Sequence, residues 1–157
     1  MISDKLLRKL EKTVSQMDLN KLSELSIMQG PDGSYFLFNK YTITKSNGYY
    51  NVAIDQVADS KTFNVLKNAV SWCTFDKQNR IPESNRIYNL DNKLASVDSE
   101  IQVHQNLVNK TKKLEEKLIY LAKLGEEKME RKQISDELAG YVISSRNWQE
   151  KRFNKSA

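Results

Sequence analysis

The sequence predicts a helix-dominant α+β protein: a small antiparallel β-meander packed on helices, followed by a long helix or a coiled-coil or helical hairpin. Aromatic and β-branched residues gather between residues 34 and 54, where turn signals interrupt them. Apolar residues recur at helical spacing on both sides of that region. From residue 83 to residue 130 there is no proline and one glycine, which favours a long helical element.

The composition fits one modest folded domain with an appended helical element. The chain has 157 residues, of which 39% are hydrophobic and 29% charged, and its net charge is +5. Cys73 is the only cysteine, so an intrachain disulfide is excluded and a reducing compartment is expected. Neither a signal-peptide core nor an apolar run of the ~20 residues that span a membrane is found, so no membrane contact is expected.

The N-terminal half divides into a helix, a meander and a second helix. The first helix is predicted over residues 3–28, ended by Gly30 and Pro31. Strands are predicted near 34–38, 41–45 and 49–54, with Asn47-Gly48 as the signal for a hairpin turn. A helix over 60–76, capped by Asp59 or Ser60, is predicted to cover the meander with one apolar stripe that consists of Phe63, Leu66, Val70 and Cys73, with Trp72 beside it.

Pro82 is expected in the first turn of the next helix, which runs from about 83 to 130 or on to 150. The predicted organisation is a small α+β core over 1–80, a long helical arm or hairpin over 82–150 and a basic tail over 151–157.

The arm opens with a heptad pattern of alternating three- and four-residue steps, which is typical of a helix that packs on another helix. Its members are Ile87, Leu90, Leu94, Val97, Ile101 and His104. In a parallel dimer Arg86 would face Asp91 of the other chain, and Lys93 would face Asp98, so both pairs would be attractive. After Ile101 a second register is predicted, and it consists of Leu107, Leu114, Leu118 and Leu121.

A third apolar patch over 134–148 leaves two arrangements open. Either the arm self-associates, or residues 132–150 fold back on 105–124 with a bend in the charged stretch 125–133. Both arrangements predict a helix interface, and they differ in whether the partner helix belongs to the same chain.

No residue pattern indicates catalysis, a cofactor or a metal. His104 is the only histidine and has no ligand at suitable spacing, and Cys73 is expected to be a buried, inert thiol. One basic-aromatic cluster, Arg146, Trp148, Lys151 and Arg152, could contact an anionic partner. Nucleic acid is therefore an alternative partner, less favoured than a protein that is either a second copy or another assembly protein.

Four segments, LKNAVSWCTFDKQNRI, LDNKLASVDSEI, KLIYLAKL and SSRNWQEKRF, resemble an uncharacterised family of small proteins from contractile-tailed phages of marine bacteria, notably cyanobacterial phages. The similarity covers roughly residues 35–153 in the same order. The resemblance implies a phage origin and a non-catalytic role in the virion or its assembly, in the host cytoplasm or the particle.

Overall fold

The computed structural model describes residue 5, residues 26–55, residue 57 and residues 59–156, with side chains described as far as residue 152. It has a five-stranded antiparallel meander followed by three helices, so the predicted helix-dominant α+β class is confirmed. The strands lie in chain order in the sheet: β1 (Ile27–Gln29), β2 (Tyr35–Leu37), β3 (Tyr41–Ser46), β4 (Tyr49–Ile54) and β5 (Ser60–Phe63). The helices are α3 (Leu66–Lys77), α4 (Ile81–Lys110) and α5 (Leu114–Ser156).

The sheet has one face toward the helices and one toward solvent. Leu37, Ile43 and Val52 alternate with polar or exposed neighbours and are buried, whereas Phe36 points to the other face and is exposed. This period of two is the pattern that places a meander on a helix layer. The described part of the sheet therefore has its core on the side of α3.

Two strands that the sequence patterns did not predict complete the sheet. Residues 27–29 form β1, so the predicted end of the first helix is wrong, and the rest of that predicted helix lies outside the described residues. Residues 60–63 form β5 and pair with β4, so the helix predicted from residue 60 begins only at Leu66. Val65 takes the N-cap position without a side-chain hydrogen bond, so neither Asp59 nor Ser60 caps this helix.

The β2–β3 connection is a tight turn with two central residues at positive φ, Phe38 at 55° and Asn39 at 55°. The amide of Lys40 donates to the carbonyl of Leu37 at 3.1 Å. A left-handed φ is unfavourable for a phenylalanine. Burial of its ring offsets that cost, because Phe38 is fully covered and meets the ring of Trp148 at 5.7 Å.

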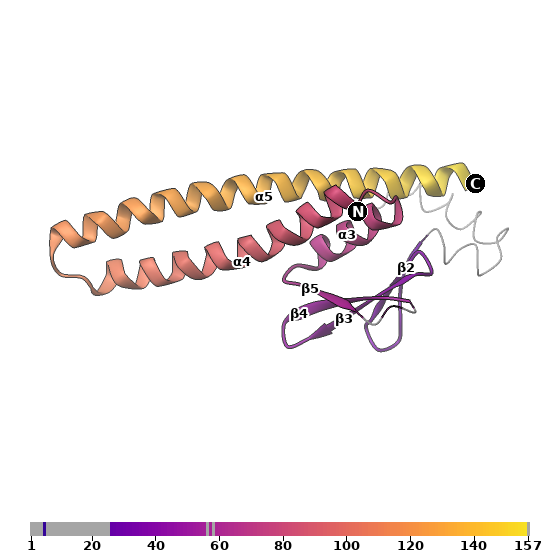
Figure 1. Ribbon diagram of the computed structural model, residues 1–157, viewed down its shortest axis with the longest axis horizontal. Helices are drawn as coiled ribbons and strands as arrows, with labels where there is room; N and C mark the ends of the chain where they lie inside the picture. The colour runs from indigo at the N-terminus through magenta and orange to yellow at the C-terminus, as the bar shows by residue number, and fades with distance from the viewer. Residues whose placement is uncertain (1–4, 6–25, 56, 58, 157) are drawn as a thin grey trace.

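α4 and α5 form one long antiparallel hairpin (Figure 1). At one end of this hairpin the sheet and α3 pack beside it, while the other end, with the connection over 111–113, extends away from them. At about 1.5 Å per residue, the 30 residues of α4 span roughly 45 Å. Pro82 stands in the first turn of α4, as predicted.

Candidate interaction surface

The heptad pattern of α4 faces α5 of the same chain. Ile87, Leu90 and Val97 are buried, and Leu94 and Ile101 are half-buried against the same core. The opposing residues of α5 in this core are Ile134, Leu138, Tyr141 and Trp148. The structure therefore has an intramolecular hairpin, but the predicted pairing of 132–150 with 105–124 is wrong, because these residues of α5 pack on the first half of α4.

The bend of the hairpin lies at residues 111–113 and not in the predicted stretch 125–133. The helix is not continuous from 83 to 130, and the charged stretch 125–133 is helical instead of bent. At the break the backbone of Thr111 is extended, with φ −81° and ψ 124°. Both its amide, at 2.9 Å, and its hydroxyl, at 2.5 Å, donate to the carbonyl of Leu107, so local hydrogen bonds close the end of α4.

Charged residues along the edges of α4 pair with α5 and not with a parallel second chain. Arg86 Nε lies 2.7 Å from Glu137 Oε2, and this hydrogen bond lowers the pKa of Glu137. Lys93 Nζ lies 3.2 Å from Glu130 Oε1. The predicted parallel-dimer pairs, Arg86 with Asp91 and Lys93 with Asp98, are therefore wrong, because both cations have partners on α5.

Exchanging one of these charges tests the pairing. We expect Lys93→Glu to lower the free energy of unfolding by about 0.5–1 kcal/mol, because the new carboxylate would face Glu130. Adding Glu130→Lys should restore the stability measured by urea denaturation. The matched control adds Asp98→Lys to Lys93→Glu. Because Asp98 pairs with Arg131, this second change should not restore the stability. If it does, the pairing of Lys93 with α5 is contradicted.

A polar layer interrupts the apolar packing midway along the arm. His104 Nδ1 lies 2.6 Å and 2.9 Å from the two carboxylate oxygens of Glu127, and its ring stacks on Tyr120 at 6.3 Å. Glu127 is buried, so the pair satisfies both groups where water is excluded. A single polar layer of this kind fixes the register of two packed helices. The heptad pattern predicted His104 at the helix interface, but it did not predict Glu127 as its partner.

A second buried polar group joins α4 to the sheet and α3. Asp91 is 1% exposed. Its carboxylate accepts from the backbone amide of Asn64 at 2.8 Å, the side-chain amide of Asn64 at 3.1 Å and the side-chain amide of Asn68 at 2.9 Å. Asp91 thus holds the β5–α3 connection on α4.

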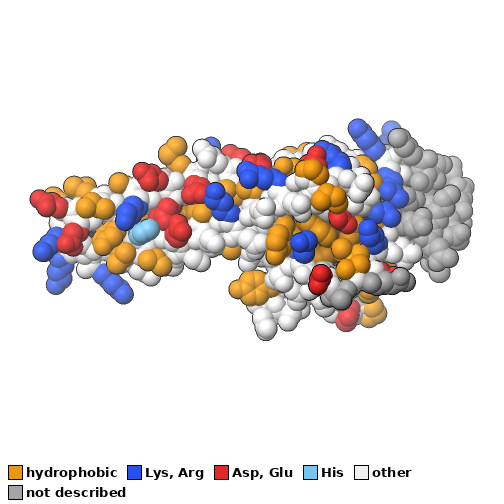
Figure 2. Space-filling model, viewed as in Figure 1, with side chains coloured by type: hydrophobic (Ala, Val, Ile, Leu, Met, Phe, Trp, Pro, Cys, Tyr) orange, Lys and Arg blue, Asp and Glu red, His pale blue; other side chains and the backbone are white. Residues whose placement is uncertain are grey.

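Part of the predicted second register faces solvent instead of α4. Leu107 is half-buried, but Leu114, Leu118 and Leu121 are 69%, 55% and 45% exposed, so their prediction as interface residues is wrong within this chain. They lie three or four residues apart on one side of α5, and Met129 and Ile143 are also exposed. Figure 2 shows hydrophobic side chains at the surface near the free end of the hairpin. Ile119 is exposed as well, but at about 100° per residue it lies away from this side of the helix. We call the five exposed apolar residues that share one side of α5, Leu114, Leu118, Leu121, Met129 and Ile143, the outer stripe.

The predicted anionic-partner cluster is only partly available. Arg146 and Lys151 are exposed. Trp148 is half-buried in the core against Phe38, and the guanidinium of Arg152 lies 5.0 Å from the centre of its ring. Because this aromatic ring packs in the fold, its predicted role as a free contact for an anionic partner is wrong.

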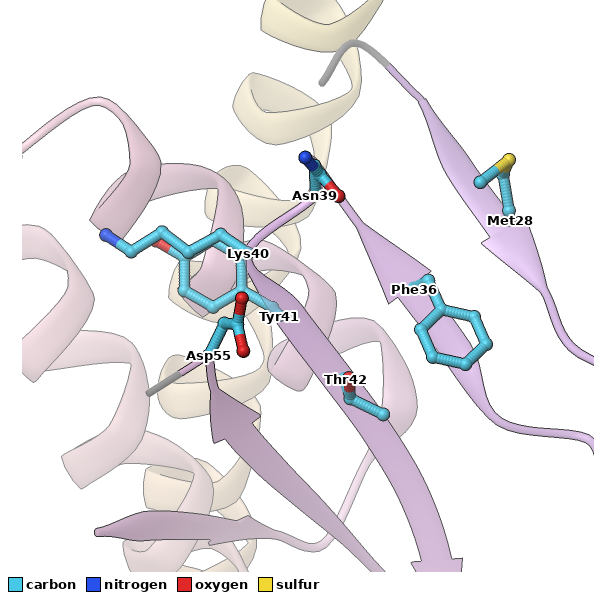
Figure 3. A pocket seen from close by; sticks show the side chains of 7 residues that line it. All are labelled: Met28, Phe36, Asn39, Lys40, Tyr41, Thr42 and Asp55. Carbon is cyan, nitrogen blue, oxygen red and sulfur yellow. The ribbon is translucent and has the colours of Figure 1, made fainter. Parts of the chain in front are cut away.

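An open depression on the sheet, with a volume of 330 Å³, is lined by Met28, Phe36, Asn39, Lys40, Tyr41, Thr42 and Asp55. Figure 3 shows Met28, Phe36 and Thr42 on neighbouring strands. Lys40 Nζ lies 3.7 Å from Asp76, and the Tyr41 hydroxyl donates to Asp76. Burial, with this hydrogen bond, raises the pKa of Tyr41, so its phenol stays protonated at neutral pH. The ammonium of Lys40 and the phenol of Tyr41 are thus both engaged by Asp76 of α3.

Cys73 lies in the core of α3 and is fully buried. Burial raises the pKa of its thiol well above the usual value, which keeps it protonated and unreactive. Among the residues that the structure describes, no three His, Cys, Asp or Glu side chains come together as metal ligands would.

None of the described helices has a stretch long and apolar enough to cross a bilayer. Comparison with protein-family models, curated proteins and solved structures finds no significant match to this chain. The fold and the exposed surfaces thus define a class only: a helix-dominant α+β protein with a helical hairpin that extends from a small sheet domain.

Proposed function

We propose that the protein is a non-catalytic interaction protein whose hairpin presents the outer stripe of α5 to a helical protein partner. The observation that carries this proposal is the exposure of five large apolar side chains along one helix, of which Met129 is 67% exposed. Covering a side chain of this size contributes about 1.5–3 kcal/mol. A single exposed residue would need no explanation, whereas a row along one helix is typical of a binding surface.

The rest of the molecule supports this role by holding the hairpin rigid. The heptad packing fixes the two helices against each other, and Asp91 ties α4 to the sheet domain. A surface on a rigid element is ordered before binding, so less conformational entropy is lost on association. The resemblance to proteins of contractile-tailed phages favours a role in the assembly or structure of a virion, with the protein in the host cytoplasm or the particle.

Site-specific photo-crosslinking in the cells that naturally make the protein tests this function. A photoreactive amino acid in place of Leu121 is expected to give one discrete covalent adduct, because this position would face the partner. The control is the same replacement of Ser99, an exposed residue of α4. Equal, diffuse labelling at both positions, or none at Leu121, would overturn the proposal.

A further inference from the structure

Two glycines inside α5 relieve no crowding among the residues that the structure describes. A side-chain carbon added at Gly125 or Gly140 would meet nothing within 4 Å. Glycine in a helix interior costs about 1 kcal/mol relative to alanine, so these positions weaken α5 without relieving any crowding in the described structure. At about 100° per residue, Gly125 lies on the same side of the helix as Leu118 and Met129, and Gly140 lies close to this side. At both positions the absence of a side chain would allow another helix to approach closely.

We propose that a second copy of the chain packs its α5 antiparallel on the outer stripe, with a twofold axis level with Ile134. The inference rests on the proposed function and names its partner. The two α5 helices would overlap from about Leu114 to Asn154, roughly 60 Å at ~1.5 Å per residue. Of the elements that the structure describes, the sheet and α3 pack on the hairpin near one end, and none lies along the other long edge of α5 (Figure 1).

Side-chain sizes match in this register. Ile143, which is 57% exposed, would lie over Gly125 of the second copy, and Met129 would lie over Ala139. The twofold axis repeats each contact. At these positions on either side of the axis, large residues thus meet small ones, as close helix packing requires. In an in-register parallel pair each residue would face its own counterpart, so Ile143 would face Ile143 and Met129 would face Met129, and large residues would not meet small ones.

Charges match in the same register. Next to the axis Lys132 would face Asp136 of the second copy, and each of these side chains is exposed. A parallel pair would instead place Lys132 opposite Lys132 and Asp136 opposite Asp136. The charge pattern therefore favours a second copy in the antiparallel direction.

Sedimentation of the purified full chain tests the dimer. The wild type is expected to have twice the chain mass of 18.2 kDa at micromolar concentration. Lys132→Glu and Asp136→Lys should each raise the dissociation constant at least about tenfold, because two symmetry-related attractions become repulsions. An equimolar mixture of the two variants should dimerise like the wild type, since every facing pair is then attractive.

Two results would overturn the dimer. The first is a wild type that is still monomeric when its concentration is raised 100-fold above that of the assay. The second is an equimolar mixture of the two variants that dimerises as weakly as either variant alone. Circular dichroism shows whether each variant stays folded, which is expected because both positions are exposed. If the wild type is monomeric while Leu121 crosslinks to a different protein, the second copy is excluded and the proposed function stands.

Disulfide formation tests the register. A chain with both Met129→Cys and Ala139→Cys is expected to form a covalent dimer, whereas either single variant should remain uncrosslinked. The two positions are about 15 Å apart along one helix, too far for a bridge within the chain. Cys73 does not interfere, because it is buried. A covalent dimer from Met129→Cys alone would show a parallel pair and contradict the proposal.

Discussion

Asp91→Ala is expected to lower the free energy of unfolding by about 3 kcal/mol or more. The carboxylate accepts three hydrogen bonds from Asn64 and Asn68 in a buried position. Its removal leaves the backbone amide of Asn64 and the buried side chain of Asn68 without that acceptor, and a buried donor without a partner costs about 1–3 kcal/mol. Urea denaturation followed by circular dichroism measures the loss.

Asp98→Ala is the matched control on the same helix. Asp98 also accepts from a cation, Arg131 at 2.6 Å, but both side chains are about half exposed, so a loss of about 0–1 kcal/mol is expected. Equal losses for the two variants would show that the contacts of Asp91 do not stabilise the attachment of α4 to the sheet domain.

Phe63→Ala is expected to cost about 3–5 kcal/mol, the usual range for removing a buried aromatic ring. Phe63 is completely buried on β5, where its ring centre lies 6.1 Å from that of Trp72 and 5.4 Å from that of Tyr88. The substitution leaves a cavity at the junction of the sheet with α3 and α4, and thermal or urea unfolding measures its cost.

Phe36→Ala provides the comparison within the same sheet. Phe36 is 42% exposed on the outer face, so the same chemical change should cost less than about 1.5 kcal/mol there. A loss as large as that of Phe63→Ala would mean that the outer face of the sheet is also a packed face.

Periodic features of the fold were predictable from the sequence because the polarity of each residue in a repeating pattern indicates whether it lies on the buried or the exposed face. The alternation in residues 41–45 and 49–54 indicates strands, and Pro82 indicates a helix start. The strands β1 and β5 were not predictable in this way, because they have only three and four residues and depend on pairing with neighbours. Residues 60–63 also continue the apolar spacing of α3, which made a longer helix the simpler interpretation.

The bend and the polar contacts depend on tertiary packing. The stretch Lys110 to Lys113 contains neither glycine nor proline, so no local signal marks the break between α4 and α5. The stretch 125–133 is helical, and its polar residues contact α4. Glu127 pairs with His104, and Arg131 pairs with Asp98. A pattern of apolar residues alone cannot reveal such pairs.

The chain order of the elements has a consequence for how the protein folds. Each strand pairs with the next one in sequence, α3 packs on α4, and α4 packs on α5. The strand pairs close short loops, whereas the hairpin contacts reach a separation of 51 residues between Arg86 and Glu137. A low mean sequence separation is associated with fast folding. The contacts of Trp148 with Phe38 and of Gln149 with Thr74 are different, because they join the last turns of α5 to segments far earlier in the chain. We therefore expect docking of these last turns of α5 to be a late step in folding, because it closes the longest loops among these contacts.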